Sequence, residues 1–379
     1  MKRICVFFII LTSILMSFTS SYAAAYQPSQ SVKSLVLMEA SGGKIIYEKD
    51  SHISLPPASI TKIMTMLLVC EAIESNKITL DTQITASERA KSMGGSTIFL
   101  ETNETMTLND LLKGIAVASA NDACVAVAEH LCGSVEAFVD MMNNRAKELG
   151  MKNTNFVNCN GLDAENHYSS AYDIALMSRE LLKHEMIQKY TTIWMDTLRG
   201  GKFQLANTNK LIRFYKGANG LKTGSTSGAG CCISASAKRD SMQLIAVVMG
   251  AQNSKERFGA ASELLNYGFA NYAVTDFGKK GTKVCDITVE NGKKEKISVV
   301  TKEDASILIS KQEKSKIKSH INIPKSLTAP IKKGQDIGEL IITSDTETLL
   351  RIPLVSSEEV KKTKASDYFL ILAKGLFFL

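Results

Sequence analysis

The fold is decided by residues 56–70, which read Pro-Pro-Ala-Ser-Ile-Thr-Lys-Ile-Met-Thr-Met-Leu-Leu-Val-Cys. Apolar residues recur here at intervals of three and four, the pattern of a helix packed on a core. Ser59 and Lys62 are three residues apart, so both side chains project from one face of the first turn. Free N–H groups at a helix start also favour a developing oxyanion. We therefore expect a buried helix that begins with a serine and a lysine.

Two further motifs contain polar residues of the kind that line an active-site cleft. Residues 119–121 (Ser-Ala-Asn) interrupt a helical pattern, and residues 222–224 (Lys-Thr-Gly) directly precede an apolar strand. Ser-x-x-Lys alone is a weak signal, because Ser315 and Lys318 repeat its spacing in a charged, strand-like region. The order Ser-x-x-Lys, Ser-x-Asn, Lys-Thr-Gly, however, is the signature of the penicillin-binding and serine β-lactamase group.

The ends of the chain indicate export. Lys2 and Arg3 precede an apolar run over residues 4–16, and alanines follow at 23–25, which is the layout of a cleavable signal peptide over residues 1–25. A retained anchor is the alternative.

Residues 358–379 contain a lysine cluster and end in a strongly apolar stretch too short to span a bilayer, which favours an amphipathic membrane-anchoring segment. A terminal helix docked on the protein is the alternative there.

The remaining composition excludes several classes of site. The chain of 379 residues has eight cysteines, an odd number of them outside the signal segment and none in C-x-x-C spacing. This argues against a disulfide framework or a zinc site, and we expect no metal or cofactor.

The net charge of +7 suits nucleic acid or an anionic wall or membrane surface. The lysine clusters at 293–294 and 314–318 lack aromatic neighbours, so solvated strand edges are favoured over nucleic-acid binding.

The hydrophobic periods predict two globular units. In residues 26–275 we expect a hairpin at 32–48, a loop at 84–104, helices starting near residues 107, 122, 134 and 170, strands at 231–237 and 243–249, and a helix at 255–272. An antiparallel sheet that joins the two ends of this unit, packed by helices, is the simplest arrangement. Residues 276–357 predict a small all-β domain with short runs at 283–289, 296–301, 306–309, 338–343 and 348–354.

Residues 26–355 resemble the serine D-alanyl-D-alanine carboxypeptidases among the low-molecular-mass penicillin-binding proteins. Further landmarks of that family lie at residues 95–100, 121–123, 160–162, 167–169 and 222–226. The resemblance implies an α+β fold of the β-lactamase and DD-peptidase type, an antiparallel sheet flanked by helices with an all-helical subregion, followed by the β domain. It also implies removal of the terminal D-Ala from peptidoglycan pentapeptide stems, inhibition by β-lactams, and attachment to the outer face of the cytoplasmic membrane.

The chemistry requires a base for the serine, because a hydroxyl is a poor nucleophile without one. Residues 224–228 have threonine at the centre of what would be a Gly-x-Ser-x-Gly elbow, so Lys62 must serve as the base in its neutral form. A lysine pKa of about 10.4 must then fall by about three units, or roughly 4 kcal/mol. Burial and a nearby like charge both lower a lysine pKa, and Lys222 would supply that charge if it faces Lys62.

By resemblance, Ser59 attacks the penultimate D-Ala carbonyl, Ser119 relays a proton to the leaving amine, and Asn121 holds the substrate and orients Lys62. The N–H groups of Ser59 and Ser225 would form an oxyanion hole, each worth about 3 kcal/mol in comparable sites. The full set is catalytic Ser59, Lys62 and Ser119 with substrate-binding Asn121, Lys222, Thr223, Gly224, Ser225 and Arg257. For Arg257 an exposed helix position is the alternative, and His167 is interpreted as a packing residue.

Three other functions compete. A β-lactamase needs a second base, and no convincing Glu-x-x-Leu-Asn lies between residues 121 and 222. An endopeptidase that cuts cross-links would use the same residues. A catalytically silent wall-binding protein is disfavoured by the intact motifs. Two departures from the family pattern remain: Ser225 stands where many relatives have a larger aromatic or histidine, and Cys231 and Cys232 are adjacent.

Overall fold

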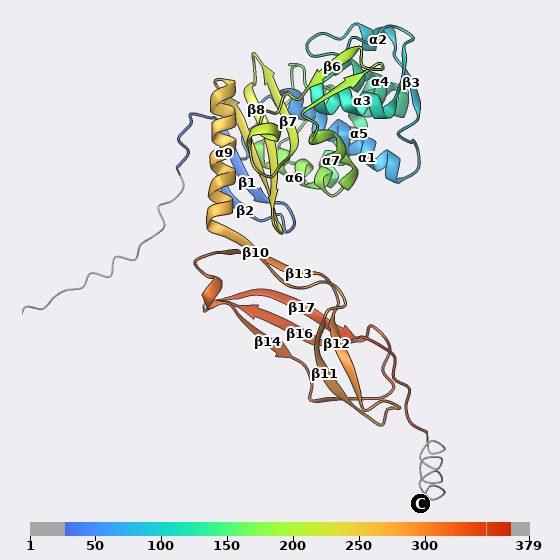
Figure 1. The fold of residues 1–379 in the computed structure, drawn as a ribbon, viewed down its shortest axis with the longest axis vertical. Helices are drawn as coiled ribbons and strands as arrows, with labels where there is room; N and C mark the ends of the chain where they lie inside the picture. Colours follow the sequence, from blue (N-terminus) through green and yellow to red (C-terminus); the bar gives the residue numbers. More distant parts are fainter. Residues whose placement is uncertain (1–26, 346, 365–379) are drawn as a thin grey trace, which may run out of the picture.

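The computed structural model describes residues 27–345 and 347–364, which form a mixed helical and sheet body followed by an all-β body (Figure 1). The predicted signal peptide and residues 365–379 of the predicted anchor lie outside the described residues. In the described part of the chain, no helix is both long and apolar enough to cross a bilayer.

A five-stranded sheet joins the two ends of the first body, as the sequence predicts. Its order is β2-β1-β9-β8-β7, with all neighbours antiparallel. The strands are β1 (Ser34–Glu39), β2 (Ile45–Lys49), β7 (Ala218–Thr226), β8 (Gly230–Arg239) and β9 (Met242–Ala251). The Lys-Thr-Gly motif lies within the edge strand β7 rather than ahead of a strand, because residues 218–226 pair along β8 despite their glycines.

Helices cover both faces of this sheet, which explains why β1 is buried along its whole length. Leu35 and Leu37 point into one core with helix α9 (Ser254–Asn271), while Val36 and Met38 point into the core around α1 (Lys62–Glu74). Successive strand residues face opposite sides, so the middle of a strand covered on both sides, residues 35–38 here, is apolar without alternation. Helix α6 (Ala171–Leu182) packs against β1 and β9.

The helical region surrounds α1, which is apolar on nearly every side and almost entirely buried. Thr107, Ser134 and Ser170 cap the helices that follow them by accepting an N–H bond, as predicted. The remaining elements are α3 (Leu108–Lys113), a π-helical turn (Gly114–Ala118), α4 (Asn121–Cys132), α5 (Val135–Glu148), a 3-10 turn (Glu185–Ile187), α7 (Gln188–Thr191) and α8 (Leu211–Phe214).

The predicted loop at 84–104 is only partly a loop. It contains helix α2 (Glu88–Lys91), which Ser87 caps, and it is flanked by strands β3 (Gln83–Thr85) and β4 (Thr105–Thr107). A hairpin of β5 (Met195–Leu198) and β6 (Phe203–Ala206) also lies outside the predicted elements. These elements are three or four residues long, too short to show a hydrophobic period.

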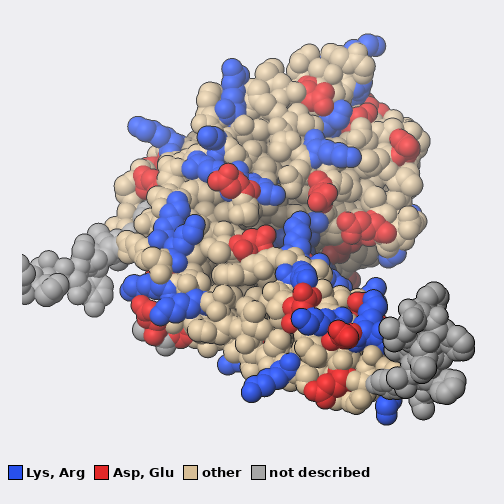
Figure 2. All heavy atoms as spheres, turned by 60° about the horizontal axis from the view of Figure 1, so that its bottom comes forward, with Lys and Arg blue, Asp and Glu red and all other residues tan. Residues whose placement is uncertain are grey.

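The second body is all β, as predicted, and starts where α9 ends. Strand β10 (Tyr272–Gly278) pairs with β13 (Ala305–Ser310), and a six-stranded sheet has the order β14-β16-β17-β12-β11-β15. Its strands are β11 (Lys283–Glu290), β12 (Lys296–Thr301), β14 (Lys318–Asn322), β15 (Ser326–Thr328), β16 (Asp336–Thr343) and β17 (Thr348–Ser356). Figure 2 brings this domain forward and shows acidic side chains among the basic ones.

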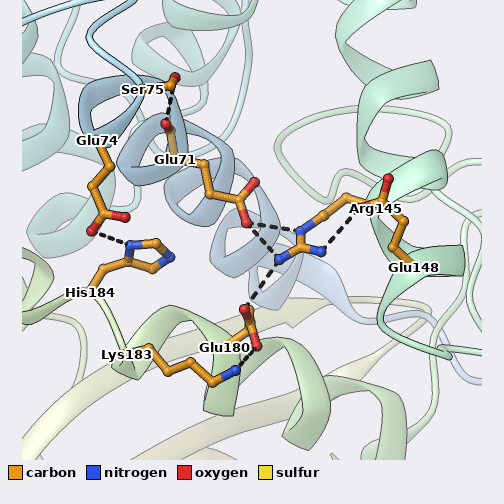
Figure 3. A network of polar contacts seen from close by, with 8 residues as sticks. All are labelled: Glu71, Glu74, Ser75, Arg145, Glu148, Glu180, Lys183 and His184. Carbon is orange, nitrogen blue, oxygen red and sulfur yellow. Dashed lines mark hydrogen bonds and ion pairs between the residues drawn. The ribbon is translucent and has the colours of Figure 1, made fainter. Parts of the chain in front are cut away.

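Arg145 ties α1 to α5 and α6 in the network of Figure 3. Its guanidinium lies 2.8 Å from Glu71 of α1, 3.2 Å from Glu180 of α6 and 3.0 Å from Glu148 of its own helix. The side chains of Arg145, Glu71 and Glu180 are each at most 30% exposed. One planar cation therefore holds three helices through charge-assisted bonds.

We expect Arg145→Gln to lower the free energy of unfolding by about 1–2 kcal/mol, because Glu71 loses its cation and Glu180 keeps only Lys183. Denaturant unfolding at neutral pH measures the change. Arg89→Gln is the matched control, since the side chains of the Arg89–Glu136 pair are 48% and 69% exposed and should contribute much less. Equal losses in both variants would contradict a structural role for the Arg145 network.

Candidate active site

Ser59 and Lys62 lie together where α1 begins. Residues Ala58–Thr61 form a 3-10 turn, and the α-helix starts at Lys62 itself. Ala58 has a φ of +48°, a left-handed conformation that is uncommon for alanine, directly before Ser59. The Nζ atom of Lys62 lies 2.9 Å from Ser59 Oγ. The structure thus places a serine and a lysine from one turn in hydrogen-bond contact.

The Lys62 side chain is fully buried and has two further partners. Its Nζ atom lies 2.7 Å from Asn121 Oδ1 and 2.5 Å from the backbone oxygen of Asn160. Both of these oxygens can only accept, whereas the Ser59 hydroxyl can also donate. An ammonium can donate to all three oxygens, and a neutral amine can donate to Asn121 and Asn160 while its lone pair accepts from the Ser59 hydroxyl. Burial lowers the pKa of Lys62, which favours that neutral form.

A left-handed residue, Ser119, separates the π-helical turn from helix α4, which begins at Asn121. The π-helical turn ends at Ser119, whose φ is +64°, and α4 begins two residues later. Asn121 donates from Nδ2 to the Gly94 oxygen and from its backbone N–H to the Ser96 oxygen, both at 2.7 Å. The same residue therefore bonds Lys62 and anchors the loop at 94–100.

Strand β7 supplies Lys222 and Thr223, both buried. Lys222 Nζ donates to the Thr223 oxygen at 3.0 Å, and Thr223 Oγ1 donates to Thr208 Oγ1 at 2.7 Å. Burial, with the charge of Lys62 in addition, holds the pKa of Lys222 well below its usual range. The two buried lysines therefore interact, and burial is the largest cause that lowers the pKa of each.

Gly224 lets β7 approach the nucleophile turn backbone to backbone. A Cβ atom at this position would lie 2.8 Å from the Ser59 nitrogen and 2.9 Å from the Ala58 Cβ. Any larger residue would push the strand away from Ser59. The next residue along the strand is Ser225, whose N–H is thus near the Ser59 amide, and two such N–H groups can bind one oxyanion.

Arg257 is buried, so the alternative of an exposed helix arginine is wrong. Its Nη1 atom lies 3.2 Å from the Gly224 oxygen and 3.4 Å from the Cys232 oxygen, and Nη2 lies 3.1 Å from Ser254 Oγ. Its Nε is buried and has no hydrogen-bond partner among the described residues. The guanidinium thus reaches the strand that carries Lys222 and Thr223.

Sequence reasoning missed Asp122 as a contributor to the site. Its carboxylate accepts N–H bonds from Ile98 at 3.1 Å and from Leu100 at 3.0 Å. An acidic residue in the first turn of a helix is usually explained by the helix dipole alone. Here it also fixes the loop at 94–100 to the start of α4, beside Asn121.

His167 supports the nucleophile turn. The Val157 N–H donates to its Nδ1 at 2.9 Å, so the proton of the neutral ring is on Nε2, which donates to Thr61 Oγ1 at 2.8 Å. Burial lowers the pKa of His167 to about 4. The packing interpretation fits this neutral ring with two hydrogen bonds.

We expect His167 to make stability pH-dependent. Its folded pKa of about 4 is below the ordinary 6.5, so its contribution is complete above pH 6.5 and is lost as pH falls toward 4. Between pH 7.5 and 5.0, the free energy of unfolding should fall by roughly 2 kcal/mol less in His167→Gln than in the wild type. Denaturant unfolding at both pH values measures this. The exposed His130 provides the control His130→Gln, and a wild-type response in both variants would contradict the assignment.

The chain is similar to known proteins over both of its bodies. The profile of D-alanyl-D-alanine carboxypeptidases (peptidase S11) matches residues 21–253, and that of the penicillin-binding protein 5 C-terminal domain matches residues 272–362. D-alanyl-D-alanine carboxypeptidase DacF of Bacillus subtilis is 48% identical over 87% of this chain and 86% of its own. Penicillin-binding protein 5 of Haemophilus influenzae superposes with a TM-score of 0.77 at 33% identity, over 89% of this chain and 100% of the other.

A further solved relative contains a bound antibiotic. Penicillin-binding protein D2 of Listeria monocytogenes, in its ampicillin-bound form, is 30% identical with a TM-score of 0.59, over 64% of this chain and 100% of the other. The likeness therefore includes named carboxypeptidases in sequence and penicillin-binding proteins in structure.

Proposed function

The chain belongs to the D-alanyl-D-alanine carboxypeptidase family of serine hydrolases, and we propose that Ser59 is its nucleophile, Lys62 its base and Ser119 its proton relay. The observation that supports this most directly is the contact of the buried Lys62 amine with Ser59, Asn121 and Asn160. In the neutral state this arrangement leaves one lone pair on Lys62, directed at the Ser59 hydroxyl.

In the proposed reaction, the oxygen of Ser59 attacks the carbonyl of the penultimate D-Ala while its proton moves to Lys62 Nζ. The N–H groups of Ser59 and Ser225 hold the oxyanion. The C–N bond then breaks, and the proton passes through Ser119 to the leaving amine of the terminal D-Ala. Water completes the cycle by hydrolysing the ester on Ser59, which frees the penultimate carboxyl group.

The substrate carboxylate would bind at β7. Lys222, Thr223 and Arg257 bring two basic side chains and a hydroxyl to this strand, and Gly224 keeps it close to Ser59. A carboxylate there would favour the charged form of Lys222. Asn121 would bind the substrate backbone on the opposite side. A β-lactam offers a carboxylate and a reactive acyl group in the same way, so we propose that it acylates Ser59.

We expect a fluorescent penicillin to label the wild-type protein and not Ser59→Ala, because the ester forms on the Ser59 oxygen. The wild type should also release D-alanine from a pentapeptide ending in D-Ala-D-Ala, and Ser59→Ala should lose at least about a thousandfold in that rate. Gel fluorescence and a D-alanine assay measure the two outcomes.

Ser315→Ala is the matched control for Ser59→Ala, because Ser315 has the same spacing to a lysine outside the site. It should keep wild-type labelling and D-alanine release. Equal labelling of the wild type and Ser59→Ala would reject Ser59 as the nucleophile. Labelling without D-alanine release would indicate a silent penicillin-binding protein.

We further propose the division of the chain: a signal peptide at 1–25, a catalytic domain at 26–275, a β domain at 276–357 and an amphipathic membrane anchor at 358–379. The end of α9 and the start of β10 at residues 271 and 272 support the central boundary. The lysines at 361, 362 and 364, followed by an apolar stretch, support attachment to an anionic membrane surface. The enzyme would then act outside the cytoplasm, on the outer face of the cytoplasmic membrane.

Removal of residues 365–379 should abolish binding to vesicles that contain anionic lipid, because the apolar part of the anchor is lost. Co-sedimentation of the mature chain and the shortened chain measures this, and penicillin labelling should be equal in both. Full vesicle binding by the shortened chain would reject the anchor.

A further inference from the structure

Phe99 is an exposed aromatic residue in a left-handed conformation, in the loop at 94–100 that Asn121 anchors. The residue is 71% exposed and its φ is +55°, which is an outlier for a bulky residue. An exposed ring buries little apolar surface and so adds little to the free energy of folding. The left-handed backbone conformation lowers the stability of the fold by about 1–3 kcal/mol. Such strain persists only where the surrounding structure determines it.

Two charged side chains impose this conformation. The N–H groups of the flanking residues, Ile98 and Leu100, donate to the Asp122 carboxylate. On the other side, Arg199 donates to the oxygens of Ile98 at 2.8 Å and Phe99 at 3.2 Å. Charge-assisted bonds therefore fix the backbone around Phe99 from both sides and leave its ring free of them.

Arg199 is itself held in place. Its Nε lies 2.7 Å from Glu104 Oε1 and its Nη2 lies 3.0 Å from Oε2, a bidentate pair. Its bonds lower the pKa of Glu104, which keeps the carboxylate charged. Arg199 lies in the turn between β5 and β6, so it couples that hairpin to the loop at 94–100.

The hairpin adds a second ring to Phe99. The Phe203 ring centroid lies 6.0 Å from that of Phe99 in an edge-on arrangement, and the Arg199 guanidinium lies 5.5 Å from the Phe203 centroid. The two rings come from segments that contact different parts of the site. Ser96, near Phe99, accepts the Asn121 N–H, while Thr208, which follows β6, bonds Thr223.

This placement fits the substrate on its acyl side. If the substrate carboxylate binds at Thr223 and Arg257 and the substrate backbone binds at Asn121, as proposed above, the rest of the peptide would run toward the loop that Asn121 anchors. An apolar pair next to a fixed cation suits an aliphatic chain and disfavours a positive charge.

We propose that Phe99 and Phe203 form a subsite for the aliphatic part of the side chain that precedes D-Ala-D-Ala in the stem peptide. Asp122 and Arg199 are the positioning residues of this subsite. The inference rests on the proposed function, because it takes the direction of the peptide from the roles of Asn121 and Thr223.

The test compares two acetylated tripeptides, norleucyl-D-Ala-D-Ala and glycyl-D-Ala-D-Ala, which differ only in the aliphatic chain. The ratio of their kcat/KM values for D-alanine release should favour norleucine in the wild type and fall by about tenfold in Phe99→Ala. Phe99→Asn should show the same fall, because asparagine tolerates the left-handed backbone and removes only the ring. Thermal midpoints report any loss of fold.

The control is Phe214→Ala, which removes another exposed ring, 73% exposed and also beside an arginine, Arg213. It should keep the wild-type ratio. An unchanged ratio in both Phe99 variants, or an equal loss on both peptides, would overturn the subsite while leaving the proposed function in place. Absence of D-alanine release from both peptides by the wild type would overturn the proposed function and the subsite with it.

Discussion

The burial of one lysine is the constraint on which the site depends. Lys62 is fully enclosed, and each of its three hydrogen-bond partners comes from a different part of the chain: its own turn, the start of α4 and the segment at 160. A buried ammonium is costly unless it is well paired, so the surroundings favour the amine. The three contacts accommodate a neutral amine whose lone pair faces Ser59. Burial is therefore the cause that favours the neutral form.

The rest of the first body brings segments to that lysine. Gly224 allows an edge strand to touch the Ser59 amide, and the left-handed Ser119 precedes the start of α4 at Asn121. Arg257 reaches β7 from α9. Each of these positions needs a backbone geometry or an approach that few residue types permit. The site therefore arises from backbone placement as much as from its reactive side chains.

Much of the fold was predictable because it follows from periodicity, whereas the site residues were predicted from the Ser-x-x-Lys, Ser-x-Asn and Lys-Thr-Gly signature and the family resemblance. The helix behind Ser59, the capped helices and the sheet that joins both ends all have clear hydrophobic patterns. Features that depend on contacts between distant parts of the sequence were not predictable. Arg257 could equally have faced solvent, because its burial depends on the packing of α9 on the sheet. Strand β14 is exposed at every residue and rich in polar side chains, so it has no apolar period. The bond from Arg199 to Ile98 joins residues 101 positions apart in sequence and has no local signal.

The pairing of β1 with β9 has a consequence for how the protein folds. Ser34 lies opposite Met249, so the first strand of the catalytic body pairs with its last. Contacts between residues so far apart in sequence form late in folding, because bringing them together costs the conformational entropy of the long chain segment between them. Strand β2 can cover one edge of β1 early, but the other edge has no partner until β9 is available. A nascent chain therefore leaves one edge of β1 without its native partner until most of the body has been synthesised.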